Sequence, residues 1–307
     1  MNRVFNYVWV ALSCILLPYF YFTARIYLYG QKNAPQGYRY PRISDLWVML
    51  PGVVAFAVIQ RVVLYFATPL IRKWVKSQDD PELCAKYTKK SCESFVKLTF
   101  YLILCSWTNY ILKETNWLPW YCGGKFGSFD ALNENMPFTE TPLYAYECFL
   151  MFLALYVYQL IDLLTSGLDR PDFNEMLCHH ICAVSCTLCA IYSNTLGTGI
   201  LVAYIHALSD IPVNTSRIFA SMKYVTPMLV SYFMMLAGWI WLRIGCLGYI
   251  LYRLWGRRFS ADLSRFDPFF TVECLFSTVL YGLHIHWLRL IVLMILHYKK
   301  TGATTDL

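Results

Sequence analysis

The chain contains six histidines, and all of them follow residue 178. Two are adjacent, His179 and His180, and stand in a mostly apolar run. An ionisable side chain costs about 2.5–3.5 kcal/mol at the centre of a bilayer, so such residues usually face a protein interior or a cavity and have a function. Adjacent helical residues point about 100° apart, so both imidazoles can border one cavity, where one reacts while the other orients it or polarises a substrate. The alternative is a packed pair satisfied by neighbouring helices, but a further histidine and aspartate nearby favour the functional interpretation.

His206 and Asp210 are the second candidate group. Their spacing of four residues places them on one helical face and within reach of each other. A carboxylate can hold an imidazole in one tautomer or accept a proton from an incoming amine. The alternative is a mutually satisfied buried pair that only fixes packing. We expect the catalytic residues to be His179, His180, His206 and Asp210.

Arg243 lies in the middle of an apolar run that begins at Gly238. A buried arginine can hold a phosphate or carboxylate, or it can neutralise Asp210. An equally acceptable alternative is that its long side chain reaches along the helix to the membrane surface.

Metal binding is a weaker interpretation of the same histidines. Membrane di-iron hydroxylases need several clustered histidine pairs, whereas here the doublet stands alone and His284-x-His286 has strand-like spacing. A single zinc ion held by His179, His180 and His206 is geometrically allowed. We nevertheless expect no metal.

The composition indicates which elements must position these residues. Of 307 residues, 58% are apolar, 18% aromatic and only 15% charged, whereas a soluble domain has about 25% charged residues. This excludes a soluble enzyme, a disordered protein and a secreted disulfide scaffold. The net charge of +7 is spread over loops, so it indicates membrane orientation and not nucleic-acid binding. The twelve cysteines lie mostly in apolar runs and lack zinc-site spacing.

We therefore expect an all-α integral membrane protein with about eight transmembrane helices, since a span needs about 20 mostly apolar residues. The first candidate is interpreted as a retained span and not a signal peptide, because it lacks a small-residue cleavage site. The sixth carries His206 and Asp210, which suits an interior helix. The expected spans cover residues 4–24, 46–70, 94–112, 143–166, 174–192, 197–219, 225–253 and 270–297.

Charge in the linkers predicts the orientation. The densest basic stretch is the linker 71–93, and with eight spans it lies on the same side as both termini. The positive-inside rule then places the termini in the cytosol. We divide the chain into two N-terminal spans with a cytosolic basic loop at 1–90, a six-span domain at 91–300 and a short tail at 301–307.

Three segments together resemble a known motif: Arg170-Pro-Asp-Phe-Asn-Glu-Met-Leu-Cys-His179-His180, Gly197-Thr-Gly-Ile-Leu201 and His206-x-x-Ser209-Asp210. They look like the Lag motif of ceramide synthases in the TLC-domain superfamily. Weaker similarity extends over most of residues 40–300.

The resemblance implies a TLC-type helical barrel, formed by the last six spans, around an intramembrane cavity. It implies transfer of a fatty acyl group from acyl-CoA to a sphingoid long-chain base in the endoplasmic reticulum, with no cofactor beyond the co-substrate acyl-CoA. Its mechanism implies an acyl-imidazole, which we expect on His179. We expect Arg170, Ser209 and Arg243 to contact substrate. Membrane lipid is a further partner, nucleic acid is not, and a homo- or heterodimer stays open.

One departure concerns the site. The family commonly has an aspartate directly after the histidine that matches His206, and this chain has Ala207. Asp210 is therefore the only carboxylate of that motif. The alternative function is a non-catalytic TLC protein that binds lipid or escorts membrane cargo; a metal-dependent lipid hydroxylase would need more histidines.

Overall fold

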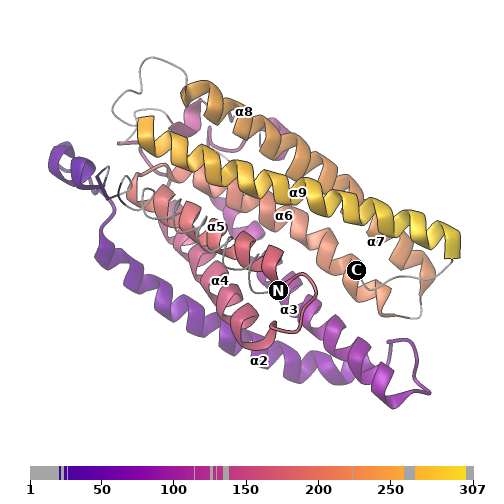
Figure 1. The fold of residues 1–307 in the computed structure, drawn as a ribbon. Helices are drawn as coiled ribbons and strands as arrows, with labels where there is room; N and C mark the ends of the chain where they lie inside the picture. The colour runs from indigo at the N-terminus through magenta and orange to yellow at the C-terminus, as the bar shows by residue number, and fades with distance from the viewer. Residues whose placement is uncertain are drawn as a thin grey trace, which may run out of the picture.

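The computed structural model describes residues 21, 24–25, 27–113, 115–124, 127–128, 130–133, 138–222, 224–258 and 267–301. In these ranges the chain is helical and contains no strand, only two isolated bridges. Figure 1 shows an elongated bundle of long helices. The helices are α2 (Met49–Arg72), α3 (Pro81–Leu112), α4 (Ala145–Ser166), α5 (Phe173–Tyr192), α6 (Leu196–Ala220), α7 (Val225–Gly238), α8 (Leu247–Arg258) and α9 (Asp267–Thr301). Shorter segments are η1 (Ile43–Val48), η2 (Trp120–Cys122), η3 (Ala131–Asn133) and η4 (Trp239–Cys246).

Seven helices of the described residues are long and apolar enough to cross a membrane. They confirm seven of the eight expected spans, because α7, η4 and α8 form one continuous helix over Val225–Gly256. The expected first span, residues 4–24, lies almost wholly outside the described residues.

Helix α3 begins at Pro81 and not near residue 94, which corrects the expected loop at 71–93. Asp80 caps this helix: its carboxylate accepts the backbone N–H groups of Glu82 and Leu83. Proline fits the first helical turn because it has no N–H to satisfy there. Apolarity marks only the part of a helix that is in contact with lipid or protein, so it gives no signal for the polar first turns of α3. Lys86, Lys89 and Lys90 lie on these turns, whereas Lys73 and Lys76 lie in the linker before them.

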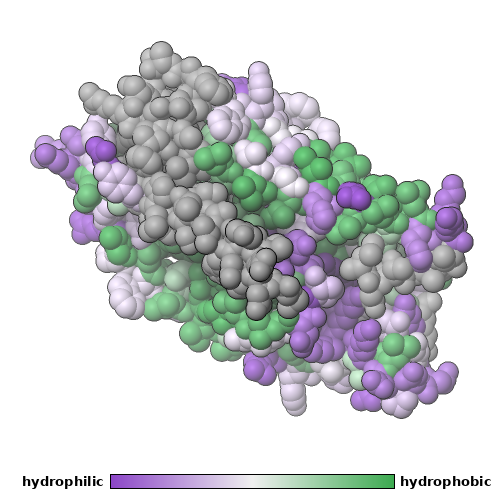
Figure 2. Space-filling model, viewed as in Figure 1, coloured by the Kyte–Doolittle hydropathy of each residue, from purple (hydrophilic) through white to green (hydrophobic). Residues whose placement is uncertain are grey.

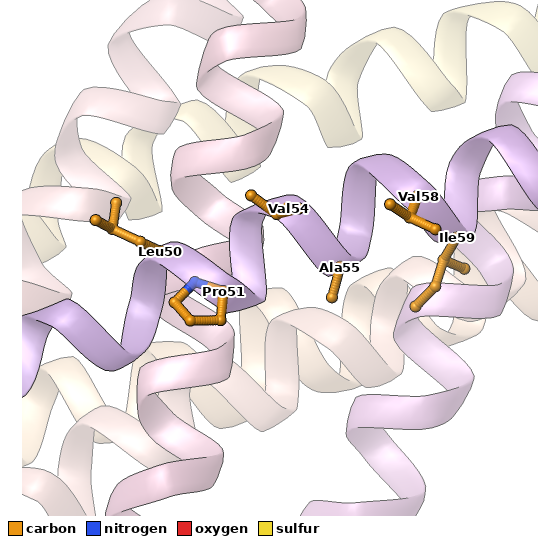
Figure 3. A pocket seen from close by; sticks show the side chains of 6 residues that line it. All are labelled: Leu50, Pro51, Val54, Ala55, Val58 and Ile59. Carbon is orange, nitrogen blue, oxygen red and sulfur yellow. The ribbon is translucent and has the colours of Figure 1, made fainter.

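The helices differ in what covers them. Helix α6 packs against α3, α4, α5, α7 and η4. In the apolar stretch of α6, 61% of the residues are buried, whereas only 11% are buried in the apolar stretch of the span that contains α2. Figure 3 shows side chains on one exposed side of α2 forming a shallow apolar groove, lined by Leu50, Pro51, Val54, Ala55, Val58 and Ile59. Exposed apolar side chains on a membrane span suit contact with lipid. The polar residues of α6 are therefore in the protein interior, as its sequence predicts.

Polar residues gather at one end of the bundle. Figure 2 shows hydrophilic side chains gathered at the end where α3 begins and α9 finishes, a smaller hydrophilic group at the opposite end, and apolar side chains between the two ends. The linker after α2 is joined there to the linker after α6, because the backbone N–H of Lys76 donates to the carbonyl of Ser221 over 3.0 Å. This polar end is called the basic end below.

Candidate active site

A cavity of about 1110 Å³ lies between α3, α4, α5, α6, α7 and α9. It is slightly larger than a typical small-ligand pocket, which has about 300–1,000 Å³. It is enclosed by the six spans that follow residue 80, as the barrel interpretation requires. Six of the seven expected catalytic and binding residues line it, all but Ser209: Arg170, His179, His180, His206, Asp210 and Arg243.

The lining changes along the length of the cavity. At the basic end it consists of cations from five parts of the chain, Lys76, Lys86, Lys90, Lys97, Arg170, Arg217 and Lys299. Toward the other end it is mainly apolar, with Phe149, Ala190, Gly199, Leu254 and Leu280. On α6 the lining runs from Ala220 to Thr198, a rise of about 33 Å at 1.5 Å per residue. His206 stands between the two ends.

The doublet enters the cavity from α5. His179 is six residues into this helix, roughly 9 Å from its start. Its ring centroid is 5.5 Å from that of His180, 6.3 Å from that of His206 and 5.4 Å from that of Trp287. The Nδ1 atoms of both doublet histidines are buried without a hydrogen-bond partner in the described part of the chain. His179 thus faces the other polar groups, while its neighbour borders the cavity from another angle.

The His206 imidazole forms no hydrogen bond with the Asp210 carboxylate among the described residues, so the expected side-chain pair is wrong. Its Nδ1 lies 2.7 Å from the carbonyl oxygen of Val202, and its Nε2 lies 2.9 Å from Nε2 of His284. Side chains on a helix lean toward its N-terminus, which brings an imidazole back onto the preceding turn. Asp210 instead forms an ion pair with Arg243.

Arg243 is 3% exposed and directs every nitrogen of its guanidinium at the protein. Nε donates to the Ser209 hydroxyl over 2.6 Å, and Nη2 donates to the Asp210 carboxylate and to the His206 carbonyl. Nη1 lies 3.4 Å from Nδ1 of His284. The guanidinium carbon is 4.7 Å from the Trp239 ring centroid, a distance typical of a cation–π contact. Of the two interpretations of Arg243, the structure shows neutralisation of Asp210 and not a reach to the surface.

A widened helical turn carries this arginine. Residues Trp239–Cys246 form a π-helix between α7 and α8, and such turns occur often at functional sites. Ser209 is 1% exposed and does not line the cavity among the described residues. Its hydroxyl donates to the His206 carbonyl and accepts from Arg243. These contacts favour a positioning role for Ser209 and Arg243 over direct substrate contact.

Arg170 occupies the mouth of the cavity at the basic end. It makes two hydrogen bonds of 2.9 Å to the carboxylate of Asp172. Burial alone would raise the pKa of the Asp172 carboxyl, but the hydrogen bonds and charge of Arg170 hold that pKa below its usual value. The same pairing raises the pKa of the Arg170 guanidinium. The mouth therefore keeps its cation at all physiological pH values.

Sequence reasoning missed His284. It is fully buried on α9, 0% exposed, whereas its neighbour His286 is exposed. The spacing of His284 and His286 gives no signal, because two residues that are two apart cannot share a helical face. The spacing that carried the signal was His284 to Trp287, three residues apart and so on one face, with ring centroids 5.7 Å apart.

Two further expectations concern Ala207 and metal. Ala207 lines the cavity and is 2% exposed, so the site lacks a carboxylate at that position. No group of three or more potential metal ligands occurs among the described residues. The site as described is four imidazoles, one carboxylate and one guanidinium.

A comparison with known families matches residues 90–293 to the TLC domain family. The chain belongs to this family. The match covers most of the six spans that enclose the cavity, so most of the lining residues lie within the matched region. With seven apolar helices long enough to span a bilayer, this TLC protein is a multi-pass membrane protein.

Curated relatives share modest identity with this TLC protein. It is similar to ceramide synthase 4 of Bos taurus, with 27% identity over 74% of this chain and 54% of the relative. It is also similar to ASC1-like protein 3 of Oryza sativa subsp. japonica, with 24% identity over 72% of this chain and 76% of the relative. Ceramide synthase 4 of Mus musculus shares 31% identity over 44% of this chain and 31% of the relative. The chain thus spans only about half the length of the bovine ceramide synthase.

Proposed function

We propose that this TLC protein is a ceramide synthase, which transfers a fatty acyl group from acyl-CoA to the amine of a sphingoid base. The observation that carries the proposal is the position of His179 and His180 in a large cavity with a basic end and an apolar end. Similarity to ceramide synthases supports the choice of reaction. CoA and (dihydro)ceramide are the products.

The doublet supplies the nucleophile. One nitrogen of His179 keeps the ring proton, and the other attacks the thioester carbonyl. The carbon–sulfur bond breaks, CoA leaves as the thiolate and takes up a proton, and an acyl-imidazole forms. The amine of the base then attacks the acyl carbon, the bond to the imidazole breaks, and the ammonium proton is lost. His180 can polarise the carbonyl oxygen as charge develops on it.

The basic end suits the phosphates of CoA. Arg170, Lys97 and Arg217 line the cavity there, beside four further lysines. Arginine and lysine form short, charge-assisted hydrogen bonds to phosphate oxygens, about twice as strong as neutral ones. CoA is water-soluble and has to enter from an aqueous compartment, so the thioester would reach the doublet from the basic end.

The apolar end suits the fatty acyl chain and the sphingoid tail. Phe149, Ala190 and Leu254 line it, and ligand sites for apolar molecules are lined mostly by such side chains. His206 lies eight residues from Thr198 on α6, so roughly 12 Å of cavity extends beyond it in this direction.

Location and orientation follow from the same proposal. The protein would lie in the endoplasmic reticulum membrane with its basic end in the cytosol, as the positive-inside rule favours. If the chain has eight spans, both termini are cytosolic as well. The active form of the protein would be a single chain, a homodimer or a heterodimer.

The test is transfer by the purified full-length chain. Incubated with acyl-CoA and sphinganine over several chain lengths, it should form dihydroceramide, and acyl-CoA alone should add one acyl mass to the intact protein. The His179→Ala variant should lose at least about a thousandfold in rate, as loss of a nucleophile does. The matched control is His286→Ala, because His286 is exposed on α9. Absence of product with every chain length would overturn the proposal in favour of a lipid-binding protein.

A further inference from the structure

His206 has both ring nitrogens engaged by protein groups. The carbonyl of Val202 can only accept a hydrogen bond, so Nδ1 of His206, 2.7 Å away, must carry a proton. A neutral imidazole has one N–H, so its Nε2 is then an acceptor. The group opposite that acceptor, 2.9 Å away, is Nε2 of His284.

The other nitrogen of His284 fixes the direction of this contact. Its Nδ1 faces Nη1 of Arg243 at 3.4 Å. A guanidinium nitrogen can only donate, so Nδ1 accepts and Nε2 of His284 carries the proton. The hydrogen bonds therefore run one way, from Arg243 to His284, from His284 to His206, and from His206 to the Val202 carbonyl.

This chain of donors is held rigidly from three helical segments. His284 is fully buried on α9, Arg243 lies on η4, and His206 is 8% exposed on α6. Trp239 fastens the contact, because its Nε1 donates to the His284 carbonyl over 3.0 Å and its ring lies against Arg243. Asp210 holds the guanidinium from the other side.

The chain of donors separates the four histidines of the site into two kinds. His206 and His284 use each other's Nε2 atoms, whereas no side-chain hydrogen bond of His179 or His180 occurs among the described residues, and their Nδ1 atoms are buried without a partner. The rings of His206 and His284 lie 6.3 and 5.9 Å from that of His179. Their rings therefore lie next to the ring of His179, which would carry the acyl group.

We propose that His284 is a positioning residue: with Arg243 it holds His206 in one tautomer whose Nε2 lone pair is occupied, which leaves His179 and His180 to react with the substrate. The part of this inference that concerns catalysis rests on the proposed function. The part that concerns His206 does not, since it follows from the contacts alone.

The first test needs no enzymatic activity. Diethyl pyrocarbonate transfers an ethoxycarbonyl group to an unprotonated imidazole nitrogen with a free lone pair, and releases ethanol and carbon dioxide. In the full-length protein, peptide mass mapping should show His179 and His180 modified and His206 protected. Exposed His286 is the internal control and should react in every variant.

Two variants of His284 distinguish a specific role from a structural one. His284→Gln keeps a donor for His206 and an acceptor for Arg243, so His206 should stay protected. His284→Phe keeps the volume but removes both groups, so modification of His206 should accelerate about tenfold, as expected when a hydrogen-bonded lone pair is released. Fast modification of His206 in the unaltered protein, or equal rates in both variants, would overturn the proposal.

The second test measures turnover. His284→Phe should lower kcat by about tenfold to a hundredfold with KM for acyl-CoA unchanged. Without its hydrogen bond to His284, His206 would no longer be held beside His179, which affects the orientation of the reacting groups and not the binding of acyl-CoA. His284→Gln should restore most of kcat. A rise in KM for acyl-CoA or a loss of thermal stability alone, without rescue by His284→Gln, would reduce His284 to a packing residue. If the unaltered protein transfers no acyl group, the proposed function fails while the mapping experiment still decides the tautomer.

Discussion

The ion pair between Asp210 and Arg243 allows a quantitative prediction. The guanidinium is 3% exposed and the carboxylate 22% exposed, so the Asp210→Asn change leaves a buried cation without its counter-charge. Removing one partner of a buried ion pair costs about 3–5 kcal/mol. At about 2–4 °C per kcal/mol for large domains, the melting temperature should fall by about 6–20 °C.

Removing both charges should cost less than the sum of the two single changes. Arg243→Met alone strands the carboxylate, but Asp210→Asn with Arg243→Met leaves no unpaired charge. Replacing a buried pair by groups of similar volume is often close to neutral. The double variant should therefore melt at or above the melting temperature of the less stable single variant. The double-mutant cycle should show strong coupling between the two residues.

The pair at the mouth of the cavity provides the matched control. Arg170 and Asp172 are 32% and 35% exposed, and their charges are paired with good geometry. An exposed ion pair contributes about 0–1 kcal/mol, so Asp172→Asn should lower the melting temperature by at most about 4 °C. Unfolding in detergent can be followed through the fluorescence of the ten tryptophans. Equal shifts for both asparagine variants, or an additive cycle, would refute the reasoning.

Four further predictions concern the cavity. Ala207→Asp restores the carboxylate common in the family and should change the rate of transfer from acyl-CoA to sphinganine; an unchanged rate would mean that the reaction does not use this position. Thr198→Phe fills the apolar end, so the rate with long acyl chains should fall while that with short chains persists. Lys97→Glu places an anion at the basic end, so KM for acyl-CoA should rise at least about tenfold, and added salt should weaken binding to the unaltered protein. Because the pKa of Asp172 is lowered in the folded protein, its pairing stabilises fully above the unfolded pKa of the carboxyl and is lost as the pH falls from there through the lower folded pKa; melting curves of the unaltered protein and Asp172→Asn should therefore converge in acid.

Hydrophobic runs predicted the spans well because a lipid environment imposes a length and a composition on every crossing helix. Helix α3 shows the limit of this signal. Its first turns lie outside the apolar run, and their boundary is set by Asp80 and Pro81, whose capping contacts involve no hydrophobicity. Cap residues would have located the start of this helix where hydropathy could not.

The candidate site was likewise predicted only in part. Periodicity put His206 and Asp210 on one face, and both do line the cavity. It could not supply their partners, because these come from other helices: Arg243 is 33 residues from Asp210 and His284 is 78 residues from His206. A side chain's rotamer is chosen by such distant contacts, so residue spacing predicts which groups share a face and not which of them bond.

The π-helix η4 interrupts the long α7–α8 segment with turns that are wider than those of an α-helix. A π turn holds more residues than an α turn, so deleting one residue between Trp239 and Cys246 would rewind the segment toward a regular α-helix. An α-helical residue turns the chain by about 100° and a π-helical residue by less, so the lost residue and the tighter winding offset each other. Leu247 and Leu254 would then still face the cavity that they line now. Deletion of one residue other than Arg243 should thus be tolerated at η4 but not in the regular α-helix of α6, where the side chains that follow would turn by about 100°.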